Sequence, residues 1–323
     1  MKQLLKLILF SGILVLASGW GFFAHQKINR LSVFILPPEM ITFYKKNIGY
    51  LTESAVNPDQ RRYAVQDEAP KHFIDLDDYG DSAAFKVPHY WGAAVQKYGE
   101  EELKERGIVP WHVNRMYYQL KEAFMLKDPD RILKVSAELG HYVSDANVPL
   151  HTTSNYDGQK TGQSGIHGFW ESRLPELYFN EYDFLVGKAE YIKNVQVAVW
   201  DAVIHASKER DSVLLIEKRL FEKEGDKKFS FETKGTQTVK VVSEEYAHKY
   251  HQLLNGMVER QLKSSIKMTA SIWYTAWVDA GQPDLKALID YKPTEEELAA
   301  RKKELQLWKE GNLKVRAHES PEN

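Results

Sequence analysis

The spacing of apolar side chains along this chain predicts a protein made almost entirely of helices. In most segments the apolar residues recur every three or four positions, which is the period of an amphipathic helix. The predicted helices are a segment from Trp20 that Pro37 and Pro38 stop, and the ranges 41–57, 112–126, 129–148, 189–212, 243–280 and 294–309. We therefore expect an all-α fold, organised as a single multi-helix domain without internal repeats.

Two segments depart from this period. Residues 81–111 look loop-rich and aromatic, with His89, Tyr90, Trp91 and Trp111 as candidate lining of a substrate cleft, although such rings more often lie in a core. Residues 227–242, with the sequence KKFSFETKGTQTVKVV, predict a hairpin or an extended loop.

The first nineteen residues have the pattern of a secretory signal peptide. Lys2 and Lys6 precede an apolar run that is too short to cross a bilayer, and small residues follow at 17–19. We expect cleavage after residue 19, which leaves Trp20 as the new N-terminus of a secreted or periplasmic protein. The helical domain then covers residues 20–310, and residues 311–323 are expected to form a disordered tail.

Composition narrows the partners and the available chemistry. The 323 residues carry 43 Lys and Arg against 45 Asp and Glu, a net charge of −2, so no global field attracts nucleic acid or an anionic membrane. A nucleic acid or membrane partner would have to be bound by a local cluster of charges. No protein partner is evident, so we expect a monomer. The chain has no cysteine, which excludes disulfides and thiolate ligands. A metal site would have to use nitrogen and oxygen donors.

The stretch from His141 to Glu171 carries such donors at the spacing that a metal requires. It reads HYVSDANVPLH at 141–151 and GIHGFWES at 165–172. His141 and Asp145 are four residues apart, as are His167 and Glu171, so on a helix each pair projects from one face. Because Val148 precedes a proline, the helix should end there and let His151 turn back toward the site. Three histidines and two carboxylates suit zinc.

Other candidates come from earlier in the chain. His25 lies close to the amine that cleavage would create at Trp20, and an uncharged amine can bind a metal. In the Asp-rich segment 59–78 we favour Asp59 and His72 as ligands and interpret the remaining carboxylates as a solvated loop. His248 and His251 have no carboxylate four residues after them and are interpreted as structural or exposed.

The order of these residues resembles that of the bacterial zinc-dependent phospholipase C family. It is also similar to the related single-strand-specific zinc nucleases of fungi and plants. The resemblance covers residues 20–175 and is carried by Trp20, His25, Asp59, His72, His141, Asp145, His151, His167 and Glu171.

The resemblance implies three zinc ions per chain. The first would be held by Asp59, His72, His141 and Asp145. The second would be held by His151, His167 and Glu171, with positions left for water. The third would be bound by the amine and carbonyl of Trp20, by His25 and by a bridging Asp145.

The chain departs from the family pattern at Ser144, where glycine is usual, and at Val148, where glutamine is usual, which affects hydrogen bonds to the ligands. The spacing from Trp20 to His25 is similar to that of the nucleases. Asn147, Glu171 and the short interval between His151 and His167 are more similar to the phospholipases.

The resulting hypothesis is an exported zinc hydrolase that cleaves phosphodiester bonds. Closely spaced zinc ions would activate water and polarise the phosphoryl group, and Asp59 is the candidate that orients or deprotonates that water. The leading substrate is a phospholipid headgroup bond, which implies transient contact with a membrane surface. The alternatives are a single-strand-specific endonuclease that leaves 5′-phosphates, and a zinc-stabilised binding protein with no turnover.

The proposed role of Trp20 can be tested on the protein's N-terminus. A form that retains any residue before Trp20 is expected to hold about one zinc fewer, because an amide nitrogen is a poor ligand in place of an amine. Zinc content of the two forms, measured by elemental analysis, checks this. Equal content would show that the cleavage site or the ligand is misassigned.

Overall fold

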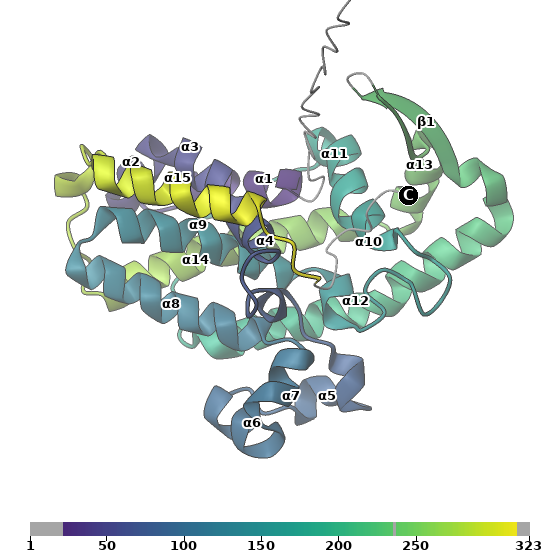
Figure 1. Cartoon of the computed structure of the whole chain (residues 1–323), viewed down its shortest axis with the longest axis horizontal. Helices are drawn as coiled ribbons and strands as arrows, with labels where there is room; N and C mark the ends of the chain where they lie inside the picture. The colour runs from purple at the N-terminus through teal and green to yellow at the C-terminus, as the bar shows by residue number, and fades with distance from the viewer. Residues whose placement is uncertain (1–21, 235–236, 315–323) are drawn as a thin grey trace, which may run out of the picture.

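The computed structural model describes residues 22–234 and 237–314, and this part of the chain is mostly helical, as the sequence predicts. A single pair of strands accompanies the helices within the described residues (Figure 1). The helices are α1 (Phe22–Val33), α2 (Pro38–Lys46), α3 (Ile48–Glu53), α4 (Asn57–Arg61), α5 (Ala83–Lys86), α6 (Trp91–Tyr98), α7 (Glu100–Glu105), α8 (Val109–Leu126), α9 (Pro129–Asp145), α10 (Ile166–Gly168), α11 (Leu174–Tyr178), α12 (Val195–Glu224), α13 (Glu244–Leu253), α14 (Met257–Asp279) and α15 (Glu295–Lys309). The strands are β1 (Phe229–Lys234) and β2 (Gln237–Val242), which pair antiparallel.

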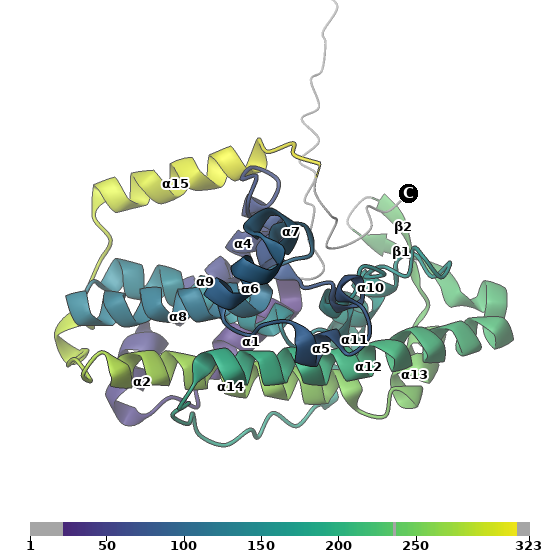
Figure 2. The same ribbon diagram turned by 90° about the horizontal axis from the view of Figure 1, so that it is seen from below.

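The interior is built where α1, α8, α9 and α14 pack against one another (Figure 2). Their apolar faces form one large core cluster, which includes Trp273 of α14 and Tyr44 of α2. Two of its large polar side chains are hydrogen-bonded: Trp273 Nε1 donates to the Ser136 carbonyl at 3.1 Å, and the Tyr44 and Ser136 hydroxyls lie 2.8 Å apart. A second cluster joins the start of α1 to α11, α12, α13 and the first half of α14. Helix α1 contributes residues to both clusters and carries His25, and the end of α9 carries His141 and Asp145.

Helix α9 begins where the sequence predicts and ends at Asp145, three residues before the predicted end at Val148. The Asp128 carboxylate accepts from the backbone N–H of Arg131 at 3.0 Å, and Pro129 takes the first helical position. Val148 is extended, with ψ of 122°, because Pro149 follows it, and a short 3₁₀ turn, η4 (Pro149–Thr152), then carries His151.

Several other boundaries differ from the sequence-based expectation. The range 41–57 is divided into α2, α3 and the start of α4, and the segment 81–111 contains α5, α6 and α7 rather than loops. The predicted helix 189–212 begins only at Val195, where Asn194 caps it, and continues to Glu224. The range 243–280 is broken into α13 and α14, because Asn255 and Gly256 both have positive φ.

The hairpin and the last helix agree with the sequence. The segment 227–242 contains β1 and β2, and α15 begins with a capping box between Thr294 and Glu297. Beyond it, the N–H of Leu313 donates to the Tyr63 carbonyl at 2.9 Å, and 315–323 lie outside the described residues together with the predicted signal peptide and Trp20. Among the helices described, none has the length and apolar composition of a membrane span.

A close approach between α1 and α9 fixes the relation of His25 to His141. The buried Asn29 amide on α1 donates to the carbonyls of Leu51 and Ala137 at 3.0 and 2.9 Å. Gly140 faces it, and a Cβ at this glycine would lie 1.9 Å from Asn29 Oδ1. The two ligand-bearing helices can therefore approach this closely only with glycine at position 140.

Gly140→Ala tests this contact. Alanine raises helix propensity, yet the clash with Asn29 is expected to lower the free energy of unfolding by about 1–3 kcal/mol, as in other overpacked cores. Gly92→Ala is the matched control, since a Cβ at Gly92 on α6 would meet no atom within 4 Å, and this variant should be neutral or gain up to about 1 kcal/mol. Urea denaturation of both variants measures the difference. A neutral Gly140→Ala would contradict the argument.

Candidate metal centre

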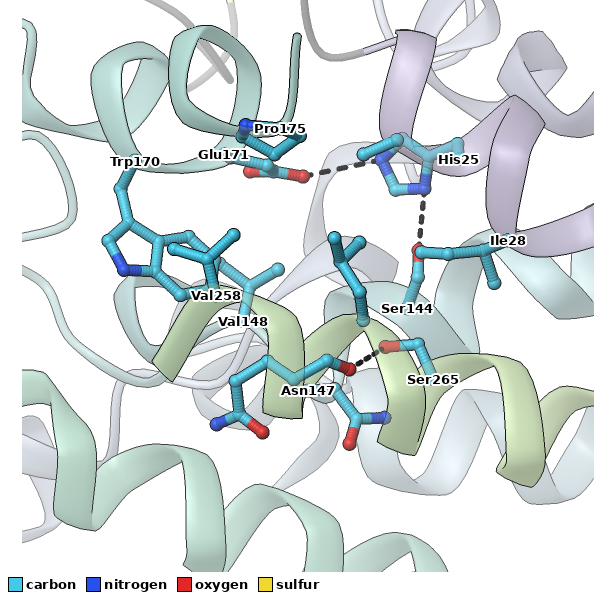
Figure 3. Close-up of a pocket in the computed structure, with 13 residues that line it drawn as sticks. His25, Ile28, Ser144, Asn147, Val148, Trp170, Glu171, Pro175, Val258 and Ser265 are labelled. Atoms are coloured by element: carbon cyan, nitrogen blue, oxygen red, sulfur yellow. Dashed lines mark hydrogen bonds and ion pairs between the residues drawn. The ribbon is translucent and has the colours of Figure 1, made fainter. Parts of the chain in front are cut away.

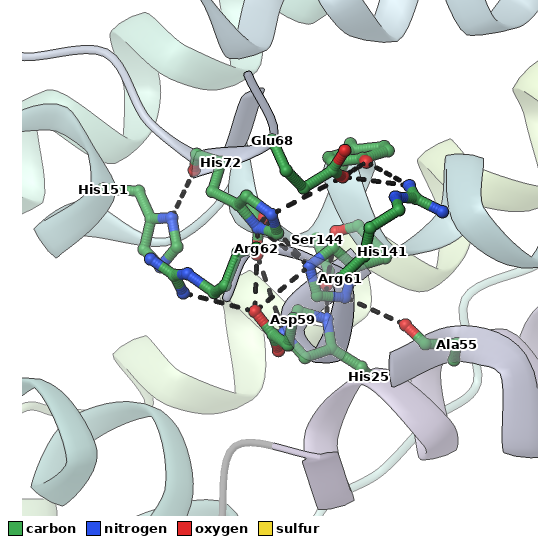
Figure 4. A network of polar contacts seen from close by, with 12 residues as sticks. His25, Ala55, Asp59, Arg61, Arg62, Glu68, His72, His141, Ser144 and His151 are labelled. Carbon is green, nitrogen blue, oxygen red and sulfur yellow. Dashed lines mark hydrogen bonds and ion pairs between the residues drawn. The ribbon is translucent and has the colours of Figure 1, made fainter. Parts of the chain in front are cut away.

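Eight of the nine residues predicted as ligands meet in one buried centre, and the ninth, Trp20, lies outside the described residues. Figure 4 shows five of the eight: His25, Asp59, His72, His141 and His151. Three groups within it have donor atoms that all lie within 4.8 Å of one another. The first group is Asp59, His72 and His141, and the second group is His151, His167 and Glu171. The third is His25, His141 and Asp145, which shares His141 with the first. They come from α1, α4, α9, α10, the 3₁₀ turns η2 (Ala69–His72) and η4, and the π-helical turn η5 (Phe169–Arg173).

The first group, together with Asp145, matches the set of four ligands that the resemblance implies for one ion. His141 Nε2 lies 3.0 Å from His72 Nδ1, and Asp145 Oδ2 lies 3.0 Å from the His72 nitrogen and 3.3 Å from the His141 nitrogen. Asp59 Oδ1 lies 3.7 Å from His72 Nδ1 and 3.7 Å from His141 Nε2. These four side chains thus surround one small volume.

The second group is made by the segment that follows α9. Glu171 Oε2 lies 2.8 Å from His167 Nε2 and 3.3 Å from His151 Nε2. This is the set of three that the sequence assigns to a second ion.

His25 connects the two groups through their carboxylates. Its Nε2 lies 3.6 Å from Asp145 Oδ1 and 3.4 Å from Glu171 Oε1, while the other oxygen of each carboxylate faces a neighbouring group. The expected bridging position of Asp145 is therefore geometrically available. Glu171 has a similar shared position, which the sequence did not indicate.

Hydrogen bonds outside the centre fix which ring nitrogen of each histidine faces inward. The Nδ1 atoms of His141, His151 and His167 face the carbonyls of Ala55, His72 and Tyr156, respectively. A carbonyl only accepts, so each Nδ1 carries the proton, and the Nε2 lone pair points into the centre. This is the arrangement found in metal-binding histidines.

Ser144 completes the same arrangement for His25. Its hydroxyl donates to the His141 carbonyl at 3.1 Å and lies 2.6 Å from His25 Nδ1, so it accepts the proton of that nitrogen. The Nε2 atom of His25 is thereby left to face Asp145 and Glu171.

The donor set fits zinc. Two ligands of a tetrahedral zinc ion lie about 3.3 Å apart when each bond is near 2.0–2.1 Å. The donor separations given above run from 2.8 to 3.7 Å, and all donors of a group lie within 4.8 Å of one another. All donors are imidazole nitrogens or carboxylate oxygens in a buried setting, where such a concentration of carboxylates needs positive charge.

The electrostatics differ from one histidine to the next. Burial lowers the pKa of His25, but the Glu171 hydrogen bond and the charges of Asp145 and Asp59 outweigh it and raise that pKa to about 9. For His72, burial together with the positive charge of Arg62 outweighs Asp145 and lowers the pKa to about 3. The negative charge of the centre is therefore concentrated around His25.

Glu68 is a supporting residue that the sequence reasoning missed. It is fully buried and lies 3.9 Å from the outward-facing Nε2 of His72, whose Nδ1 faces the centre. Arg61 and Lys71 donate to it at 2.9 and 2.6 Å, and against the effect of burial Arg61 holds the pKa of Glu68 well below its usual range. The i, i+4 spacing from Glu68 to His72, the rule that paired His141 with Asp145, was the available signal.

Arg62 is a second missed residue. Its side chain is only 2% exposed, and Nη1 lies 3.4 Å from Asp59 Oδ1. A permanent cation thus lies beside the carboxylate that was singled out for the attacking water. The Arg61-Arg62 pair directly follows the Asp59 turn in the sequence, but adjacent arginines usually indicate solvent exposure.

A small cavity lies beside His25 and Glu171 (Figure 3). Its walls are mostly apolar side chains from α1 and α14, together with Val148 and Trp170. Asn147 also lines it, with its amide held by the Val143 carbonyl and the Ser264 hydroxyl, each at 2.8 Å. The apolar wall lowers the local dielectric and strengthens charge interactions on this side of the centre.

The remaining candidates of the sequence lie elsewhere. Trp111 is in the core, with ring centroids 5.6 Å from Trp91 and 5.2 Å from Trp200, and His89 stacks on Trp200. Asp77 accepts from Thr153 and Ser154 rather than facing the centre. The rings of His251 and Tyr178 stack at 4.1 Å, and His248 is exposed, in line with the structural or exposed roles expected of these histidines.

A comparison with known protein families finds no match to this chain, and a comparison with curated proteins finds none either. The assignment of function accordingly depends on the centre itself.

The zinc content of variants distinguishes metal ligands from histidines that bind no metal. The mature protein is expected to bind about three zinc ions, and His167→Ala and Glu171→Gln should each remove about one, because the second group has no spare donor. His248→Ala is the control, since this exposed histidine lies on α13 outside the three groups, and it should leave zinc content unchanged. Elemental analysis after dialysis measures this. Zinc loss in the control alone would refute the assignment.

Proposed function

We propose that this protein is a zinc-dependent phosphoric diester hydrolase of the phospholipase C type. The observation that carries the proposal is the sharing of carboxylates: Asp145 and Glu171 each direct one oxygen toward His25 and the other toward a neighbouring histidine group. Shared carboxylates bring cations close together, and closely spaced metal ions are typical of enzymes that cleave phosphate esters.

The residues of the centre suit hydrolysis of a phosphodiester. Zinc ions bound here would lower the pKa of water and offset the charge that develops on the phosphoryl oxygens. Asp59 lies at the edge of the first group, where its carboxylate can orient a water molecule and accept its proton. The Arg62 guanidinium beside Asp59 contributes a positive charge for an anionic substrate.

The second group supports catalysis over a purely structural role. It offers three ligands, His151, His167 and Glu171, and zinc with three protein ligands usually keeps a position for water or substrate. A structural zinc site is normally closed by four protein ligands. This difference argues against a zinc-stabilised binding protein.

A lipid headgroup is the substrate class that we favour. Asn147, Glu171 and the short interval between His151 and His167 resemble the phospholipases, and Asn147 lies in the cavity wall next to His25. Trp111, one of the rings considered for stacking against bases, is buried against other core aromatics. We also propose that the chain is exported and that the amine of Trp20 supplies the remaining ligands beside His25.

A side-by-side hydrolysis assay tests the proposal. The mature protein, at equal zinc, is given phosphatidylcholine vesicles, single-stranded DNA and single-stranded RNA. We expect release of phosphocholine, and loss of that activity together with a lower melting temperature after chelation, since the ions link distant segments. Cleavage of nucleic acid to 5′-phosphates with the lipid intact would assign the chain to the nuclease alternative. Full activity without zinc would end the proposal.

A further inference from the structure

The β1–β2 hairpin has an exposed aromatic face that the metal centre does not use. In the antiparallel register Phe231 is directly opposite Lys240, and Phe229 is opposite Val242, so these side chains share one face of the hairpin. Phe231 is 73% exposed and Phe229 is 42% exposed. The ammonium of Lys240 lies 4.0 Å from the Phe229 ring centroid. The face thus combines two apolar rings with a cation.

The opposite face of the hairpin is attached to the metal centre. Glu232 is ion-paired with Arg173, which lies two residues after the predicted ligand Glu171 in the same π-helical turn. Figure 1 and Figure 2 both show the hairpin at the end of the molecule near α10 and α11, which carry or adjoin the second group. A partner that binds to the aromatic face would therefore lie close to the metal centre.

The base of the hairpin is held by a buried ion pair. Lys228 donates to Glu217 of α12 at 2.7 Å, and both side chains are buried. Gln163, in the loop that leads to His167, donates to the other oxygen of Glu217 at 2.6 Å. The hairpin, α12 and the loop that delivers His167 are thereby joined, and the exposed phenylalanines are presented from a fixed support.

We propose that this face, formed by Phe229, Phe231 and Lys240, docks the protein on the surface of an anionic phospholipid bilayer. The rings would enter the headgroup region, and the cation would meet lipid phosphates. The only acidic residue of the segment 229–242 is Glu232, and Arg173 neutralises it on the other face. This inference rests on the proposed phospholipase function for its purpose, but the docking itself can be measured separately.

Single-stranded nucleic acid is the less favoured occupant of this face. Binding of a strand would require a basic groove that follows the phosphates as well as rings for the bases. On the described part of this face Lys240 is the single cation, and the whole chain has a net charge of −2. Insertion of rings into a lipid surface requires less positive charge.

Vesicle flotation with the zinc-loaded protein tests the docking. The vesicles contain equal parts of phosphatidylcholine and phosphatidylglycerol analogues in which a phosphonate replaces the glycerol–phosphate ester, so that no turnover occurs. Phe231→Ser is expected to weaken binding by about tenfold, the effect of removing one partly inserted ring. Phe85→Ser is the matched control, since Phe85 is 71% exposed on α5 away from the hairpin, and it should bind like the unaltered protein.

A second variant and a soluble substrate keep the outcomes distinct. Lys240→Glu should weaken binding to the anionic vesicles and leave binding to vesicles of the phosphatidylcholine analogue alone nearly unchanged. Hydrolysis of a water-soluble chromogenic phosphodiester should be equal in all variants.

Failure of the unaltered protein to float, or equal binding of Phe231→Ser and Phe85→Ser, would overturn the docking face. Loss of RNA cleavage in Phe231→Ser with vesicle binding intact would assign the face to nucleic acid. Absence of any hydrolysis, with docking as expected, would instead count against the proposed function.

Discussion

The burial of Asp145 and Glu171 is the constraint on which the structure around them depends. Two carboxylates in an interior of low dielectric are costly unless cations and hydrogen bonds compensate them. Five histidines face these carboxylates and supply part of the compensation. Their outward-facing nitrogens contact backbone carbonyls, the Ser144 hydroxyl or, for His72, the Glu68 carboxylate. Bound cations would meet the rest. The close approach of α1 and α9 at Gly140 serves the same end, because it brings His25 within reach of both carboxylates.

Sequence reasoning reached the all-α class and the ligand segment because both depend on local periodicity. The capped start of α9, its end before Pro149 and the i, i+4 pairs follow from the backbone alone. The segment 81–111 was misinterpreted because helices as short as α5 and α7 are stabilised by tertiary packing rather than by propensity. The break at Gly256 was missed because the apolar pattern continues on both sides of it. Arg62 and Glu68 were missed because buried charges are recognised by their partners, and only the fold shows those partners.

The hairpin at 229–242 shows how a peripheral element can belong to a centre to which it contributes no ligand. Glu232 of the hairpin is ion-paired with Arg173, in the π-helical turn that carries Glu171. At the base of the hairpin, Glu217 accepts hydrogen bonds from Lys228 and from Gln163, in the loop before His167. The Lys228–Glu217 ion pair is buried, so it resists salt better than a surface pair does. The support of the second ligand group therefore extends well beyond the residues that face an ion.

The shared carboxylates also have a consequence for how the centre fills. An ion held by one oxygen of Glu171 draws electron density from the oxygen that faces His25, and the same holds for Asp145 between His25 and the first group. If ions occupy these positions, binding at one would change the affinity of the next, and thermodynamic linkage would make that influence mutual. Binding of the proposed zinc ions would then be cooperative, and the amounts of partly loaded protein would depend on coupling between the positions rather than on three independent dissociation constants.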